Sequence, residues 1–369
     1  MVAPVGRRHG GYHSHVVGER GNAQVVAVTG VSGYLGRRLV RLLDDDPTVE
    51  RIVGLDIAEP DVGSPKLEFH QIDVRDARVV KVLPGVDVVV HLAWQLDPIR
   101  EQERTRATNV DGTRNVVEAA GATGVRKLVH ASSATVYGAN PDNDFPLTEA
   151  SPLRANPEFA QAWHKLQAER MIEAFHEDHP EVVVTVLRPA IVFGPNVQNF
   201  ISRMLEAPRI TTVKGYEPPL QLVHEEDVAT AIHLAVSRDL PGAYNVAADG
   251  WLTGDEVLEI AGKKRVELPE AVAFSLAERL WKLGIAEAPP GELHFVMHPW
   301  VVDNAKLRAT GWAPRNGNRE TLAEAIEAHR PWIAVGRARM RKDDLAKSAA
   351  ATLGVVGAMA LVRRRRKKP

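Results

Sequence analysis

The chain of 369 residues contains no cysteine. Without a thiol the protein can form no disulfide, offers no thiolate nucleophile and has no cysteine ligand for a metal, a composition that fits a reducing cytoplasm. Residues 1–22 lack an apolar run, so we expect a disordered tail there and not a secretory signal. We interpret its three histidines as part of that flexible tail, and we expect no metal site.

Charge is unevenly distributed along a chain whose net charge is only −1. Residues 336–369 hold eleven Lys and Arg against two Asp, which leaves residues 1–335 with a net charge of −10. An acidic body argues against specific nucleic-acid binding by the fold itself. As a helix, the uncharged run 348–362 would span about 22 Å, less than the roughly 30 Å core of a bilayer. We therefore expect a cytoplasmic protein, and peripheral contact of residues 348–368 with anionic lipid remains open.

Short apolar runs alternate with helical patterns through most of the chain. Runs such as VDVVVHLA and VVVTVL are of the solid type found in parallel sheets that are buried on both faces. This alternation predicts a doubly wound parallel sheet of the Rossmann type in an α/β fold. The expected strands are 24–29, 51–56, 67–71, 86–92, 127–131, 182–188 and 243–247, and the expected helices are 34–45, 76–82, 101–123, 158–178 and 225–237.

The same pattern divides the chain into parts. Residues 23–193 carry the regular alternation and predict a nucleotide-binding domain, whose sheet is completed by about 221–247. Residues 194–335 are looser and contain many Pro and Gly, which predicts mainly a smaller C-terminal substrate lobe. Residues 336–369 form a basic and apolar tail.

A glycine-rich loop, TGVSGYLG at residues 29–36, joins the first expected strand to the first expected helix. Gly30 permits a tight turn, Gly33 lets the backbone approach a phosphate, and Gly36 lets helix and strand pack closely. Backbone N–H groups at the helix start then face an anion, the arrangement that holds a dinucleotide pyrophosphate. Asp56 follows Gly36 by 20 residues, where a carboxylate accepts hydrogen bonds from an adenosine ribose and repels a 2′-phosphate. The sequence therefore predicts NAD binding in preference to NADP.

A second signal is the segment LVHASSATVYG at residues 128–138, in which a strand ends in Ser132 and Ser133. Ligands of open α/β sheets lie beyond the carboxyl ends of the strands, so a serine at this point can hydrogen-bond a substrate oxygen. Turn chemistry is the alternative explanation for a pair of serines taken alone.

These motifs occur in order with IDVRD, HLAW, NVDGT, LRPAIVFGP, QLVHEEDVA and TGWAPR. Over residues 23–330 the chain resembles the extended short-chain dehydrogenases/reductases of the NAD-dependent epimerase/dehydratase family. The resemblance implies a homodimer and a small-molecule substrate. It also implies that the cofactor contacts are made by Gly30, Val31, Ser32, Gly33, Tyr34, Leu35, Gly36, Asp56, Asp73, Val74, Leu92, Ala93, Asn109, Lys165, Pro189 and Val192.

The family's chemistry uses a serine together with a Tyr and a Lys that are four residues apart on one helix face. The resemblance assigns the serine to Ser133 and the Lys to Lys165, which would hold the cofactor ribose and lower the tyrosine pKa. Position 161 is Gln and not Tyr, and a carboxamide forms hydrogen bonds but does not titrate. The expected catalytic positions are therefore Ser133, Lys165 and Gln161, with the proton supplied by water or by a group not identified. The neighbouring His164 lies on another side of the helix, so we do not expect it to replace the tyrosine.

Two departures from the family pattern bear on the substrate. Ala134 and Thr135 stand where the family's sugar-nucleotide dehydratases carry an acidic pair, so we expect no 4,6-dehydration. Leu220 stands where its epimerases carry an Arg for the nucleotide pyrophosphate, and Arg315 remains as an anion contact. We expect an oxidoreductase acting on a sugar-like or small alcohol or ketone. The alternative, suggested by Gln161, is a catalytically silent NAD(P)-binding sensor or scaffold associated with a membrane through its tail.

Overall fold

The computed structural model describes residues 23–95, 102–197, 206–286, 289–335 and 338–341. At its centre is a seven-stranded parallel sheet with the strand order β10-β6-β5-β4-β1-β2-β3. All seven strands lie where the sequence predicts them, which confirms the doubly wound Rossmann fold. They are β1 (Gln24–Thr29), β2 (Val49–Asp56), β3 (Leu67–Gln71), β4 (Val88–His91), β5 (Lys127–Ala131), β6 (Val183–Pro189) and β10 (Gly242–Val246).

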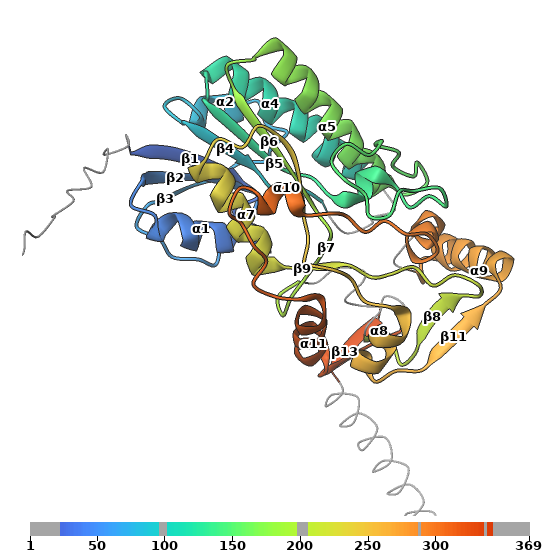
Figure 1. Ribbon diagram of the computed structural model, residues 1–369. Helices are drawn as coiled ribbons and strands as arrows, with labels where there is room; N and C mark the ends of the chain where they lie inside the picture. Colours follow the sequence, from blue (N-terminus) through green and yellow to red (C-terminus); the bar gives the residue numbers. More distant parts are fainter. Residues whose placement is uncertain (1–22, 96–101, 198–205, 287–288, 336–337, 342–369) are drawn as a thin grey trace, which may run out of the picture.

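Helices cover both faces of the sheet (Figure 1). On one face lie α1 (Tyr34–Asp45) and α7 (Glu225–Ser237), and on the other lie α2 (Val79–Val82), α4 (Gly112–Thr123) and α5 (Ala160–Asp178). Successive side chains of a strand point to opposite faces. In β1, Val26 and Val28 therefore join the core beneath α1 and α7, whereas Ala27 joins the core on the other face.

Two expected helices differ from the prediction, one by an interruption and one by its length. The helix predicted over 101–123 begins as α3 (Gln102–Arg106), passes through a π-helical turn (Ala107–Asp111) and continues as α4. A π turn adds a residue to the helical repeat and re-aims the side chains within it. The helix predicted over 76–82 is only α2, because the Asp76 carboxylate accepts a hydrogen bond from the Arg78 N–H at 2.8 Å and holds this stretch in a turn.

The other elements form a smaller lobe at the carboxyl ends of the strands (Figure 1). Within it, β7 (Ile191–Phe193) pairs with β9 (Leu222–His224), and β8 (Ile210–Val213) pairs with β11 (Arg265–Leu268). The segment 221–247 thus returns to the large sheet through β10, while β9 stays in the lobe. The helical elements of the lobe are α8 (Gly254–Ala261), α9 (Glu270–Leu283), η3 (Pro290–Val296) and α11 (Asn318–His329), whereas α10 (Ala305–Arg308) returns to the large sheet, where Leu307 joins the core beneath α7.

A hairpin of β12 (Trp332–Val335) and β13 (Ala338–Arg341) follows the lobe, so part of the segment expected as a tail is paired strand. Among the helices that the structure describes, none has the length and apolar character needed to cross a bilayer. The predictions for residues 1–22 and for the apolar run 348–362 lie outside the described residues.

Candidate functional site

The glycine loop lies where the strand order reverses, because β1 stands between β2 and β4. Gly30 has a φ of +72°, and a Cβ on it would come within 2.6 Å of the Ala93 backbone nitrogen. A Cβ on Gly36 would overlap the carbonyl oxygen of Gly30. Both glycines are therefore required by close backbone approach, as the motif predicts.

The N-terminus of α1 is open to an anion. Its N-cap, Gly33, is exposed and provides no side-chain hydrogen bond, and the first turn contains no acidic residue. The first N–H groups of a helix have no partner within the helix and carry its positive dipole end. An uncapped start at the end of β1 is thus suited to a phosphate.

Asp56 ends β2 beside this loop. Its Oδ2 atom accepts a hydrogen bond from the Ser32 N–H at 2.9 Å, and its Oδ1 atom accepts one from the Ile57 N–H at 2.7 Å. The carboxylate is half-buried, and these bonds fix it at the edge of the loop, where a ribose of a bound dinucleotide would lie.

Asp73 and Val74, two of the expected cofactor contacts, lie after β3. Asp73 forms an ion pair with Arg75 at 2.6 Å, and the hydrogen bond from Arg75 lowers the pKa of Asp73. Val74 is buried and packs against Gly112, where an added Cβ would come within 2.7 Å of it.

The segment that follows β4 is hydrogen-bonded to the end of β1. The Leu92 N–H donates a hydrogen bond to the Thr29 carbonyl at 3.1 Å, and the Ala93 N–H donates one to the Thr29 hydroxyl at 3.3 Å. Leu92 and Ala93 therefore lie beside the glycine loop.

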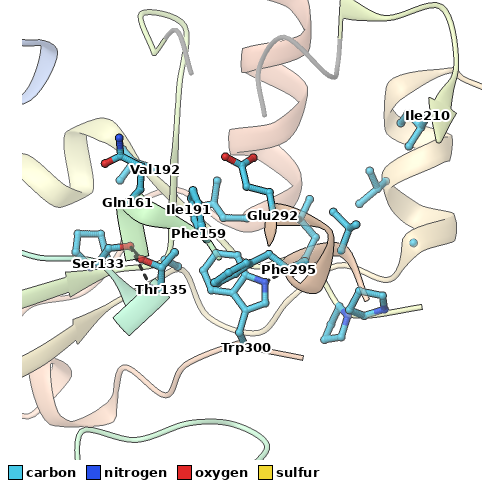
Figure 2. Close-up of a pocket in the computed structure, with 18 of the residues that line it drawn as sticks. Ser133, Thr135, Phe159, Gln161, Ile191, Val192, Ile210, Glu292, Phe295 and Trp300 are labelled. Atoms are coloured by element: carbon cyan, nitrogen blue, oxygen red, sulfur yellow. Dashed lines mark hydrogen bonds between the residues drawn. The ribbon is translucent and has the colours of Figure 1, made fainter. Parts of the chain in front are cut away.

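A cavity of about 370 Å³ lies between the strand ends and the lobe (Figure 2). It brings together residues from the loop, from η2 (Ala134–Tyr137), from α5 and from β7. Of the residues predicted from the sequence, Tyr34, Leu35, Ser133, Gln161, Lys165, Pro189 and Val192 line it.

Ser133 both begins η2 and faces this cavity. Its Oγ atom accepts hydrogen bonds from the Thr135 N–H at 3.2 Å and from the Thr135 hydroxyl at 2.9 Å (Figure 2). A serine hydroxyl has one proton to donate and two acceptor sites. Both acceptor sites are thus used within the turn, and the hydroxyl proton is available to an oxygen in the cavity.

Lys165 is buried at the inner end of the cavity. Its ammonium donates a hydrogen bond to the Ala131 carbonyl at 2.6 Å and lies 3.5 Å from the centroid of the Trp94 ring. Burial disfavours the charged form and lowers the pKa of Lys165 to about 7. The neighbouring His91 and His130 stack at 5.4 Å, and burial lowers the pKa of both, so they stay neutral beside the lysine.

Gln161, four residues before Lys165, connects α5 to the segment that follows β4. Its side-chain oxygen accepts a hydrogen bond from the Trp94 indole N–H at 2.8 Å, and its side-chain nitrogen donates to the Gln95 carbonyl at 2.8 Å. Asn109, from the π-helical turn, accepts a hydrogen bond from the Gln95 N–H at 2.8 Å. Gln161 and Asn109 together hold the chain where it leaves β4. His164 is buried but is not among the described residues that line the cavity.

Sequence reasoning missed a buried charged network behind Ser133. Glu169 accepts a hydrogen bond from the Ser132 hydroxyl and forms an ion pair of 2.7 Å with Arg188. Arg188 also donates to the Tyr137 hydroxyl at 2.8 Å, which in turn donates to Asn245 at 2.8 Å. Burial raises the pKa of Tyr137 to about 12. The available signal was an Arg inside the apolar run of β6, since a charge there needs a partner.

Comparison with known proteins agrees with this geometry. The model of the NAD dependent epimerase/dehydratase family matches residues 26–247. An uncharacterised protein of Mycobacterium tuberculosis is 29% identical over 304 residues, which cover 79% of this chain and 80% of that protein. The dTDP-D-glucose 4,6-dehydratase of Mus musculus is 26% identical over 332 residues, covering 84% of this chain and 89% of the enzyme. The solved structure of UDP-glucose 4-epimerase from Thermus thermophilus in complex with NAD is 25% identical, with a TM-score of 0.64, and covers 83% of this chain and 99% of the epimerase.

Proposed function

Because the chain belongs to the NAD-dependent epimerase/dehydratase family, we propose that it is an oxidoreductase that binds NAD in the glycine-loop cradle and acts on an alcohol or ketone at Ser133. The observation that carries this proposal is that the fixed carboxylate of Asp56 lies beside the uncapped start of α1, and that the first turn of α1 lines the cavity together with Ser133. The related epimerase from Thermus thermophilus was solved in complex with NAD.

The cradle residues fit a dinucleotide. Gly30 and Gly36 allow the close backbone packing of the loop, and the exposed N-cap Gly33 places no side chain between the loop and a pyrophosphate. Asp56 offers carboxylate oxygens to the ribose hydroxyls and opposes a 2′-phosphate by charge repulsion. NAD, when bound, supplies a hydride acceptor, and NADH supplies the hydride.

Oxidation of a substrate alcohol to a ketone would also release the proton of its hydroxyl group, which residues at the cavity would have to receive. Ser133 holds the substrate oxygen through its hydroxyl proton. Lys165, with a pKa of about 7, is suited to take up and release the proton at neutral pH, directly or through a water molecule. Gln161 takes no part in proton transfer, because its carboxamide does not titrate and its oxygen and nitrogen are both engaged by the protein.

The proposal is tested with the purified full chain in two measurements. Calorimetric titration reports NADH binding, and absorbance of NADH reports turnover on a panel of alcohols, ketones and sugar nucleotides. We expect NADH to bind and at least one class of substrate to turn over, with Ser133→Ala reducing kcat by about a hundredfold while NADH affinity changes by less than about threefold.

Two outcomes would contradict the proposal in different ways. Binding of NADH without turnover of any compound would favour the silent sensor or scaffold, the alternative that Gln161 suggests. Absence of NADH binding would contradict both the oxidoreductase and the sensor or scaffold hypotheses.

A further inference from the structure

The part of the cavity away from Ser133 has hydrocarbon walls. Phe159, Phe295 and Trp300 pack edge to face along one side, with ring centroids 5.2 Å apart in the first pair and 5.1 Å apart in the second (Figure 2). The Trp300 N–H is used within this wall, because it donates to the Phe295 carbonyl at 3.1 Å. Aliphatic side chains from β7 and α8 add to the lining, namely Ile191, Val192, Val257 and Leu258.

The cations at the cavity already have partners within the protein, and the ammonium of Lys165 donates to the Ala131 carbonyl. Among the described residues that line the cavity, the cations are Lys165 and Arg265. Arg265 forms ion pairs with Glu217 at 2.7 Å and with Asp255 at 2.8 Å. Its guanidinium is therefore neutralised before any ligand enters.

The remaining charges do not favour a diphosphate. Glu217 and Glu292 also line the cavity, so the two carboxylates balance the two cations of the described lining. Leu220 lines it as well, at the position where the family's epimerases carry an arginine. A diphosphate placed here would leave water and meet Arg265 already paired with two carboxylates and Lys165 already bonded to the Ala131 carbonyl, which is costly. An apolar ring or chain would instead gain from contact with the aromatic wall.

We infer, on the basis of the proposed function, that the substrate is an uncharged and mainly hydrocarbon alcohol or ketone. Its oxygen lies at Ser133 and its rings or chain pack against Phe159, Phe295 and Trp300. A nucleotide diphosphate is not part of the substrate. This substrate class differs from the UDP-glucose and dTDP-D-glucose that appear in the names of the related enzymes.

The test compares apolar substrates with a sugar nucleotide on the full chain. Cyclohexanone, the bicyclic ketone 2-decalone and a steroid ketone are added to the NADH-loaded chain, where NADH oxidation reports their reduction. Cyclohexanol, the alcohol of 2-decalone and UDP-glucose are added to the NAD⁺-loaded chain, where NADH formation reports their oxidation. We expect kcat/KM for the better apolar alcohol to exceed that for UDP-glucose by at least about a hundredfold. Turnover of UDP-glucose that surpasses both apolar alcohols would overturn the inference, as would the failure of every apolar ketone to react.

A matched pair of variants locates the effect. Leu258→Asn places a carboxamide on α8 in the cavity wall, whereas Leu276→Asn makes the same change on the exposed face of α9, outside the lining. We expect KM for 2-decalone to rise by about tenfold or more in the first variant only. Equal effects of the two changes would contradict the proposed wall.

NADH affinity, measured in both variants, separates this inference from the proposed function. If the wild-type chain binds no NADH, the proposed function fails. If NADH binds normally and only the preference for apolar substrates is missing, the inference alone fails.

Discussion

The Trp94 indole N–H donates a hydrogen bond to the side-chain oxygen of Gln161 at 2.8 Å. The ammonium of Lys165 lies against the face of the same indole, 3.5 Å from its centroid. Gln161 and Lys165 thus meet one aromatic ring from successive turns of α5. A glutamine where the family uses a tyrosine therefore has a positive role here, which is to hold the segment after β4 beside the lysine.

Restoring the tyrosine tests this role. In Gln161→Tyr the single hydroxyl stands at the far end of a rigid ring, so it cannot take the places of both the carboxamide oxygen that accepts from Trp94 and the carboxamide nitrogen that donates to the Gln95 carbonyl. We expect turnover to fall by about tenfold or more and the unfolding free energy to fall by about 1–2 kcal/mol. Steady-state kinetics and urea denaturation measure the two effects. A gain of several orders of magnitude in kcat would instead identify a decayed enzyme.

Lys165→Met tests the buried ammonium through the pH dependence of stability. The pKa of Lys165 is about 7 in the folded protein and about 10.4 in an unfolded chain. Between these values the unfolded chain binds more protons than the folded chain. The free energy of unfolding of the wild type therefore increases as the pH rises from about 7 to about 10. Below pH 7 the buried lysine lowers the free energy of unfolding by its full amount. We expect the variant to lose this rise, which amounts to at most about 5 kcal/mol. Urea denaturation at several pH values checks it, and parallel curves for the two proteins would contradict the assignment.

Gly36→Ala tests the cradle against a matched glycine. An added Cβ at position 36 overlaps the Gly30 carbonyl, whereas nothing lies within 4 Å of a Cβ at Gly63. We expect Gly36→Ala to weaken NADH binding by about a hundredfold or more, and we expect Gly63→Ala to leave it unchanged. Calorimetric titration, with circular dichroism to verify folding, compares the two. Normal NADH affinity in Gly36→Ala would contradict the placement of the cofactor.

Asp56→Ser tests the choice between cofactors. The carboxylate that repels a 2′-phosphate is removed, while a hydroxyl still accepts a hydrogen bond from the Ser32 N–H. We expect the ratio of NADH to NADPH affinity to fall by about tenfold or more. Parallel titrations with the two reduced cofactors give this ratio, and an unchanged ratio would mean that Asp56 does not face the ribose.

The sheet and the cradle were predictable because their signals are local. Solid valine runs such as Val88–His91 mark strands buried on both faces, and the spacing of Gly30, Gly33 and Gly36 is contained in one loop. The role of Gln161 was not predictable, because its partner Trp94 is 67 positions away in the sequence. That partner can be identified only when the fold shows which segments lie together.

The same reasoning explains the other differences. The π-helical turn that aims Asn109 leaves no trace in a 3.6-residue pattern. The ion pair between Glu169 and Arg188 joins α5 to β6, and no spacing rule connects them. The hydrocarbon wall joins Phe159 to Phe295 and Trp300, which lie far from Phe159 in the sequence, so composition could not reveal it.

The most direct test of the central claim is a fluorescence titration of the purified full chain with NADH and with NADPH. We predict saturable binding of NADH at one site per chain, with an affinity at least about tenfold higher than that for NADPH. The absence of saturable NADH binding, or tighter binding of NADPH, would contradict the account.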